Sequence, residues 1–187
     1  MSIEVIRPGV LSLLQDSGRF GQHRIGLTNG GPLDPQAFHY CNRLLENEPA
    51  STAVEISFGG ARFRAAVDTC ICVTGASMPL TINGAEKPLW AVHPVQAGDE
   101  IALDFAVHGC RSYLGVAGGF RIEPSFGSTA TVMREHIGGL DGDKLQPGDL
   151  LPCDRVTQRK RLYLPADHQP HYQDMVTVRV IPGYQQA

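Results

Sequence analysis

Short apolar strands separated by turn residues are the feature that most restricts how this chain can fold. Apolar residues alternate with others at the period of a β-strand in IEVIR, AVEISF, ARFRAAV, TCICVTG, PLTING, DEIALDFA, RSYLGVAGG and DLLPC. In AVEISF this alternation places Val54, Ile56 and Phe58 on one face. The sequence has 21 glycines and 13 prolines, many of them between these segments. The pattern predicts a mainly β fold, either a closed barrel or a sandwich.

One segment breaks the strand pattern and predicts a single principal helix. Residues 33–48 read LDPQAFHYCNRLLENE, with Asp34 suited to the N-cap and Pro35 to the first helical position. Phe38, Cys41 and Leu44 follow at helical spacing. We expect this helix to close an open side of the β-structure with its apolar stripe.

A short internal repeat predicts the domain organisation. EVIRPG at residues 4–9 recurs as VRVIPG at 178–183, close to the last residue of the sequence. We therefore expect residues 1–155 to form one module and 156–175 a polar linker. Residues 176–187 are then the first strand of a second module that is mostly absent from this sequence.

Charge and cysteine content exclude several classes of function. The net charge is −3, and no cluster of basic residues interleaved with aromatics indicates nucleic-acid binding or an anionic membrane surface. The five cysteines show neither CxxC nor zinc-ligand spacing, and Cys70 and Cys72 alternate on a predicted strand as small core residues. With no signal-like start and no run of 18 apolar residues, the sequence predicts a cytoplasmic protein without a metal site.

The stretch LLQDSGRFG, residues 13–21, contains the strongest candidates for a site. Asp16 can accept backbone N–H groups two residues on, which makes a turn without any function. Arg19, however, has a planar guanidinium suited to bidentate hydrogen bonding with a carboxylate or phosphate, and Gln15 adds an amide beside it. Both interpretations stay open from the residues alone.

Two further regions contribute weaker candidates. Gly30 and Gly31 permit a close approach of backbone to a ligand, whereas Asp34 is better explained as a helix cap than as part of an anion site. Glu55 is expected to be exposed, with a partly buried acid next to Arg19 or Arg43 as the alternative. Arg111 points either into a pocket or to solvent.

The order of several strings resembles one known family. RPGVLSLLQDSGRFG, GGPLDPQAFHYCNRLLENE, AVEISFGGARF, VTGA, QAGDEI, GCRSYLGVAGGF, FGS and LQPGDLL follow one another as in the KipA / allophanate hydrolase subunit 2 family, also called the biotin-dependent carboxyltransferase family. This family includes the C component of bacterial 5-oxoprolinase. The resemblance implies a cyclophilin-like β-barrel fold, with the start of a second barrel at the C-terminus.

The resemblance also implies an activity and partners. It favours ATP-dependent hydrolysis of 5-oxoproline to glutamate, with ATP bound through a complex that contains a KipI-like partner and a LamB/YcsF-like partner, the B and A components. Within that reaction we expect Asp16 and Arg19 to be catalytic, and Gln15, Gly30, Gly31 and Arg111 to bind substrate.

Two alternatives stay open. In the first, the chain is a KipA-like regulatory protein that binds a KipI-like partner. In the second, it is a carboxyltransferase component acting on urea or a similar amide. The chain also departs from the family pattern, since Thr129 and Asp143 stand where arginines are usual, which weakens anion binding by those two loops.

Overall fold

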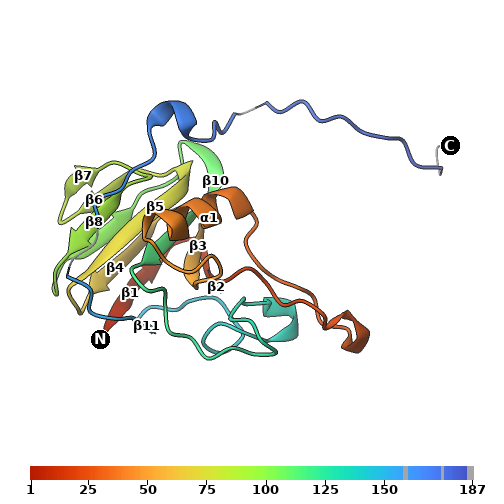
Figure 1. The fold of residues 1–187 in the computed structure, drawn as a ribbon, viewed down its shortest axis with the longest axis horizontal. Coiled ribbons are helices and arrows are strands. Elements are labelled where there is room, and N and C mark those ends of the chain that lie inside the picture. Colours follow the sequence, from red (N-terminus) through yellow and green to blue (C-terminus); the bar gives the residue numbers. More distant parts are fainter. Residues whose placement is uncertain (158–159, 174, 185–187) are drawn as a thin grey trace.

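Two antiparallel β-sheets face each other and form most of the molecule (Figure 1). The computed structural model describes residues 1–157, 160–173 and 175–184. The six-stranded sheet has the order β11 (Leu150–Pro152), β1 (Ser2–Pro8), β4 (Ala61–Ala65), β9 (Glu100–Leu103), β6 (Leu80–Ile82) and β7 (Ala85–Lys87). The five-stranded sheet has the order β2 (Leu11–Gln15), β3 (Ala53–Ser57), β10 (His108–Val116), β5 (Thr69–Ser77) and β8 (Val92–Val95). The prediction of a mainly β fold is confirmed.

The main core lies between the sheets and explains the alternation in the sequence. In β4 the side chain of Phe63 is buried in this core, while those of Arg62 and Arg64 on the opposite face are exposed. In β3, by contrast, every residue is buried, because the second face of the five-stranded sheet is also covered. Strands buried on both faces lose the simple alternation of polar and apolar residues.

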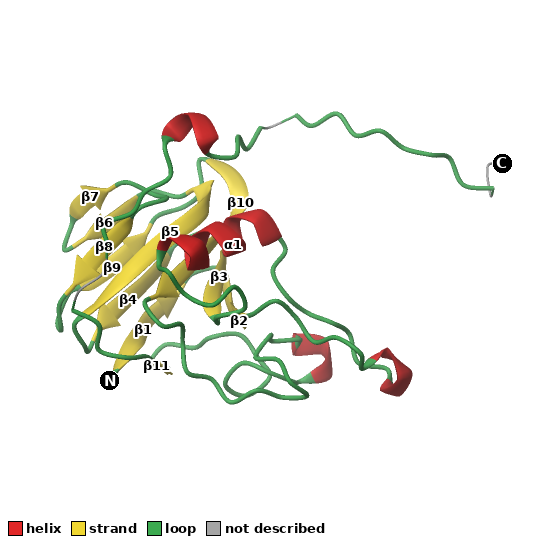
Figure 2. Ribbon diagram, in the orientation of Figure 1, coloured by secondary structure: helices red, strands yellow, loops and turns green. Residues whose placement is uncertain are grey.

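Helix α1 (Pro35–Leu44) covers that second face, as Figure 2 shows. Asp34 caps it as predicted, because its carboxylate accepts the Ala37 N–H at 3.0 Å. The helix packs on β5 and β10 and forms a second apolar cluster with Cys72, Trp90 and Tyr113 among its members. The helix therefore lies across a sheet face and does not fill a gap between strands.

Close contact between helix and sheet depends on one glycine of β10. A Cβ added to Gly115 would lie 2.7 Å from the Cys41 sulfur and 2.8 Å from Leu45 Cδ1. Both distances are shorter than non-bonded heavy atoms tolerate, so a larger residue here would have to displace the Cys41 and Leu45 side chains.

Among the described residues, three 3₁₀ turns lie in the connections. They are η1 (His23–Ile25), η2 (Met133–Glu135) and η3 (Ala166–His168). Within the described ranges, no helix has both the length and the apolar character needed to cross a lipid bilayer.

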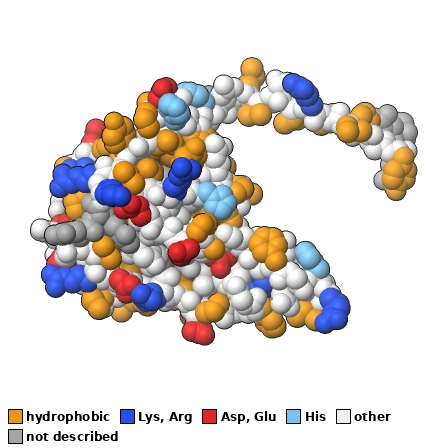
Figure 3. Space-filling model, in the orientation of Figure 1, with side chains coloured by type: hydrophobic (Ala, Val, Ile, Leu, Met, Phe, Trp, Pro, Cys, Tyr) orange, Lys and Arg blue, Asp and Glu red, His pale blue; other side chains and the backbone are white. Residues whose placement is uncertain are grey.

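The segment predicted as a linker packs on the helix-side cluster along part of its length. The Leu164 N–H donates to the Trp90 carbonyl at 2.8 Å, and Ala91 forms an isolated bridge with Tyr163. Residues 176–184 then extend away from the sheets, with exposed apolar side chains along them (Figure 3). That they begin a second module stays a prediction, and residues 158, 159, 174 and 185–187 of the two predicted segments lie outside the described residues.

Candidate functional site

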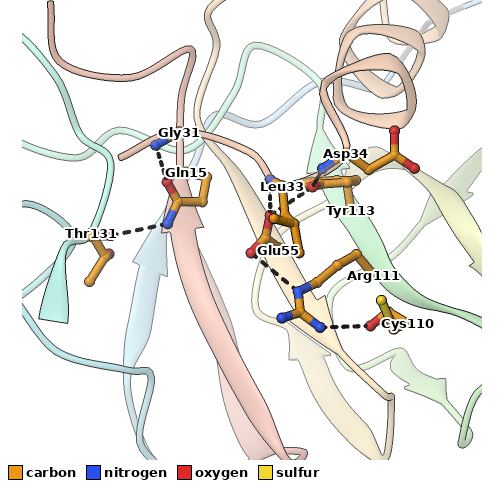
Figure 4. Close-up of polar contacts among 9 residues, drawn as sticks. All are labelled: Gln15, Gly31, Leu33, Asp34, Glu55, Cys110, Arg111, Tyr113 and Thr131. Carbon is orange, nitrogen blue, oxygen red and sulfur yellow. Dashed lines mark hydrogen bonds and ion pairs between the residues drawn. The ribbon is translucent and has the colours of Figure 1, made fainter. Parts of the chain in front are cut away.

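Five of the six residues predicted for the site belong to one network of loops. Gln15, at the end of β2, is buried, and its amide joins two loops (Figure 4). The side-chain oxygen accepts the Gly31 N–H at 3.0 Å, and the side-chain nitrogen donates to the Thr131 carbonyl at 3.1 Å. Gln15 thus ties the segment before α1 to the loop of residues 125–131.

Asp16 organises the same loop. One carboxylate oxygen accepts the Gly18 N–H at 2.8 Å and the Ser128 hydroxyl at 2.6 Å. The other accepts the Thr129 N–H at 2.7 Å. The local turn predicted from the sequence is therefore present, and the two bonds to residues 128 and 129 add a long-range role.

Arg19 is almost completely enclosed, with 1% of its surface exposed. Its Nε donates to the Ser125 carbonyl at 2.9 Å, and its Nη2 donates to the Ser128 and Ala130 carbonyls at 3.3 and 3.1 Å. Among the described residues, Nη1 has no hydrogen-bond partner. The guanidinium therefore holds a loop in place with most of its donors.

The two adjacent glycines have a packing role. A Cβ at Gly30 would lie 3.0 Å from Val132 Cγ2, and one at Gly31 would lie 3.2 Å from the Ser17 carbonyl oxygen. Both residues also have positive φ, at 63° and 96°. The groups that lie close to these glycines therefore belong to the chain's own loops.

A second group of polar side chains centres on Glu55. Its carboxylate accepts the Tyr113 hydroxyl at 2.6 Å and the Leu33 N–H at 2.8 Å (Figure 4). The expectation that Glu55 is exposed is wrong, since only 6% of it is accessible. The segment leading into α1 crosses this part of β3 and covers the acid, and neither Arg19 nor Arg43 is the cation beside it.

That cation is Arg111, the sixth predicted residue, which pairs with Ser57 in the β3–β10 register. Its Nε lies 3.7 Å from a Glu55 oxygen and makes no hydrogen bond among the described residues. One Nη donates to the Cys110 carbonyl at 3.2 Å. The guanidinium also lies 5.6 Å from the centre of the Phe58 ring, within the range of a cation–π contact.

Phe58 departs from the predicted alternation. Strand β3 ends at Ser57, and Phe58 has a φ of 59°, which is rare for a large side chain. Its ring is half exposed and does not share the buried face of Val54 and Ile56. The ring and the guanidinium of Arg111 together form the accessible side of the Glu55 group.

Tyr113 connects the Glu55 group to the start of the helix. Its hydroxyl accepts the Asp34 N–H at 2.8 Å while donating to Glu55. The Tyr172 hydroxyl donates to the Asp34 carboxylate at 2.6 Å. Burial first, and then the nearby carboxylates, raise the pKa of both tyrosine hydroxyls above the usual range.

Sequence reasoning missed Tyr113, Tyr172 and Phe58. A signal for Tyr113 was present, because an acid within the apolar run AVEISF needs a buried donor opposite it. The β3–β10 register places Tyr113 directly across from Glu55. No group of three or more metal-ligating side chains occurs in the part of the chain that the structure describes.

Comparisons with known proteins agree with this architecture. Residues 25–187 match the family model described as carboxyltransferase domain, subdomain A and B. The C component of 5-oxoprolinase from Escherichia coli is 35% identical over 152 residues, or 80% of this chain. Urea amidolyase of Saccharomyces cerevisiae is 33% identical over 151 residues, also 80% of this chain. The crystal structure of TTHA0988 superposes with a TM-score of 0.87 and 29% identity, covering 100% of this chain and 37% of that one.

The chain spans 48% of the length of the Escherichia coli protein and 8% of the urea amidolyase. The family match includes Glu55 and Arg111 and begins after Arg19. Since the match extends over most of the sequence, the chain belongs to the carboxyltransferase domain family, subdomains A and B.

Proposed function

We propose that this chain forms part of the C component of an ATP-dependent 5-oxoprolinase, which hydrolyses 5-oxoproline to glutamate together with partner proteins. The observation that carries the proposal is the 35% identity to the Escherichia coli protein of that name. The pairing of the partly exposed Arg111 with the buried Glu55 supports it chemically.

The substrate has a carboxylate next to the N–H of its lactam ring, and the Glu55 group offers a complement to each. Arg111, whose side chain is 21% exposed, supplies the guanidinium that binds the carboxylate. Tyr113 and Leu33 both donate to Glu55 Oε2, whereas Oε1 faces Arg111 and is available to the lactam N–H. Phe58 supplies an apolar surface for the ring methylenes.

ATP supplies the driving force in the proposed reaction, and the N-terminus of helix α1 does not fit a phosphate group. Helix α1 would be the natural anion site, but the carboxylate of Asp34 already caps its first turn. We therefore assign ATP to the partners, a KipI-like protein and a LamB/YcsF-like protein. None of the five cysteines forms a disulfide within the described residues, which supports placing the complex in the reducing cytoplasm.

Asp16 and Arg19 enter this proposal as positioning residues. Both hold the loop of residues 125–131 through bonds to its backbone. Gln15 adds a third contact to that loop and one to Gly31. The direct catalytic roles predicted for Asp16 and Arg19 stay predictions.

One alternative is favoured by a specific observation. The 33% identity to a yeast urea amidolyase supports a carboxyltransferase component acting on urea or a related amide. A KipA-like regulatory role is the remaining alternative.

Reconstitution separates the three functions. The chain is co-expressed with the KipI-like and LamB/YcsF-like partners, and 5-oxoproline-dependent release of ADP and glutamate is measured. The proposal predicts equal amounts of both products, and only with all three proteins present. Carboxyl transfer from carboxybiotin to urea would support the first alternative instead. A stable complex with the KipI-like partner that catalyses neither reaction would support regulation.

A further inference from the structure

One tyrosine hydroxyl joins the C-terminal part of the chain to the start of helix α1. The Tyr172 hydroxyl donates to one carboxylate oxygen of Asp34 at 2.6 Å, across 138 positions of the sequence. The other carboxylate oxygen of Asp34 caps the helix by accepting the Ala37 N–H at 3.0 Å. The Asp34 side chain is therefore held from two sides, by the helix and by Tyr172.

The backbone at Asp34 is part of the Glu55 group (Figure 4). The Leu33 N–H donates to Glu55 Oε2 at 2.8 Å. The next N–H, that of Asp34, donates to the Tyr113 hydroxyl, which in turn donates to the same Glu55 oxygen. The position of residues 33 and 34 therefore determines how Oε2 is held, while Oε1 faces Arg111 at 3.7 Å.

The ring of Tyr172 is itself fixed by packing. It is partly buried and contacts the helix-side cluster. A Cβ added to Gly109 of β10 would lie 3.0 Å from Tyr172 Cγ, so the ring lies directly on the backbone of this strand. A ring already held in this way loses little further freedom when its hydroxyl binds Asp34.

Tyr172 is also the last anchored residue before the chain extends away from the sheets (Figure 1). Residues 173 and 175–184 are all exposed, so among the described residues none beyond Tyr172 is even partly buried. The bond between Tyr172 and Asp34 is therefore the place where this end of the described chain contacts the candidate site.

We propose that Tyr172 is a positioning residue of the Glu55 group. By holding Asp34, it keeps the N–H groups of residues 33 and 34 directed at Glu55 and Tyr113, and it thereby fixes the orientation in which Glu55 Oε1 is presented beside Arg111. The effect of Tyr172 on substrate rests on the proposed function, whereas its effect on the two N–H groups does not.

Tyr172→Phe tests this role, because it removes the hydroxyl and keeps the ring on Gly109. NMR spectra of the 187-residue chain are compared with and without the change. We expect the amide proton of Leu33 to move upfield as its bond to Glu55 lengthens, and the side-chain carboxylate carbon of Glu55 to shift with it. Signals of Leu114, in the centre of the five-stranded sheet, should stay in place, which also confirms that the variant is folded.

Tyr163→Phe is the matched control. Tyr163 lies in the same segment and is 69% exposed, and no hydrogen bond of its hydroxyl occurs within the described ranges. The same chemical change at this position should leave the Leu33 and Glu55 signals where they are.

The reconstituted complex tests the effect on substrate. Tyr172→Phe should raise the KM for 5-oxoproline about three- to tenfold with little change in kcat, as expected when a binding group is less well held. In a Glu55→Gln background the same change should raise KM less than about twofold, because Tyr172 acts through Glu55. A role in stability alone would give equal effects in both backgrounds.

Two results would overturn the proposal. One is a Tyr172→Phe spectrum in which the Leu33 and Glu55 signals are unchanged, and the other is an equal rise in KM with and without Glu55. A complex without 5-oxoproline-dependent turnover would instead contradict the proposed function. The NMR comparison would then still decide the role of Tyr172, because it does not depend on turnover.

Discussion

Replacing Tyr113 by phenylalanine tests whether the Glu55 group stabilises the fold. The change keeps the ring, which packs edge-to-face on Phe38 at 5.8 Å, and removes only the hydroxyl. That hydroxyl donates to Glu55 at 2.6 Å and accepts the Asp34 N–H at 2.8 Å. The substitution therefore leaves one carboxylate oxygen and one N–H without this partner.

The cost follows from the two lost bonds. A hydrogen bond to a charged acceptor contributes about 1.5–3 kcal/mol, and an N–H left without a partner costs about 1–3 kcal/mol when buried. Since Asp34 is only partly buried, water can replace some of the second bond. We expect the free energy of unfolding to fall by about 3 kcal/mol.

Urea denaturation measures this loss, with the fluorescence of Trp90 as the probe. Trp90 is the single tryptophan and is buried in the same apolar cluster as Tyr113. With a slope of about 2–3 kcal/mol per molar urea, the midpoint should fall by about 1–1.5 M. Tyr40→Phe is the control, since its ring contacts Trp90 and no hydrogen bond of its hydroxyl occurs among the described residues. A loss below about 0.5 kcal/mol for Tyr113→Phe would refute the reasoning.

Three further outcomes are expected. The pKa values of the Tyr113 and Tyr172 hydroxyls are raised in the folded state, so both phenols stay protonated there at a pH at which they ionise in the unfolded chain. Above about pH 10 the unfolded state therefore binds fewer protons than the folded state. Stability then falls by up to about 1.4 kcal/mol per pH unit for each tyrosine, and a pH series of urea midpoints should show a shallower fall in Tyr113→Phe. Gly115→Ala should cost about 1–3 kcal/mol by the same denaturation assay, because its Cβ would lie 2.7 Å from a helix sulfur. Arg19→Lys should speed amide hydrogen exchange across residues 125–130, because one ammonium group replaces a guanidinium that donates to three carbonyls. Unchanged exchange would argue against a role of Arg19 in holding this loop.

The sheets and the helix could be predicted because their signals are local. Alternation in β4 and the Asp34–Pro35 cap each depend on a few neighbouring residues. Cys70 and Cys72 are buried as predicted, because their strand is covered by the helix-side cluster.

The site was harder to predict because its contacts are long-range. Glu55 is buried by a segment that precedes α1, and its partners come from positions 33, 111 and 113. Arg19 resembled a ligand-binding residue by type, yet three carbonyls more than a hundred residues away surround it. Residue type and spacing do not reveal such partners, since they depend on which loops the topology brings together.

The central claim is that Arg111 binds the substrate carboxylate. The most direct test is the steady-state kcat/KM of the reconstituted complex for 5-oxoproline. We expect Arg111→Ala to lower it about 10- to 100-fold, mainly through KM, as loss of a hydrogen-bonded charge implies. Arg62→Ala, which breaks an exposed ion pair with Glu100 on the other sheet, should leave it unchanged. Equal kcat/KM values for Arg111→Ala and the unmodified chain would contradict the account.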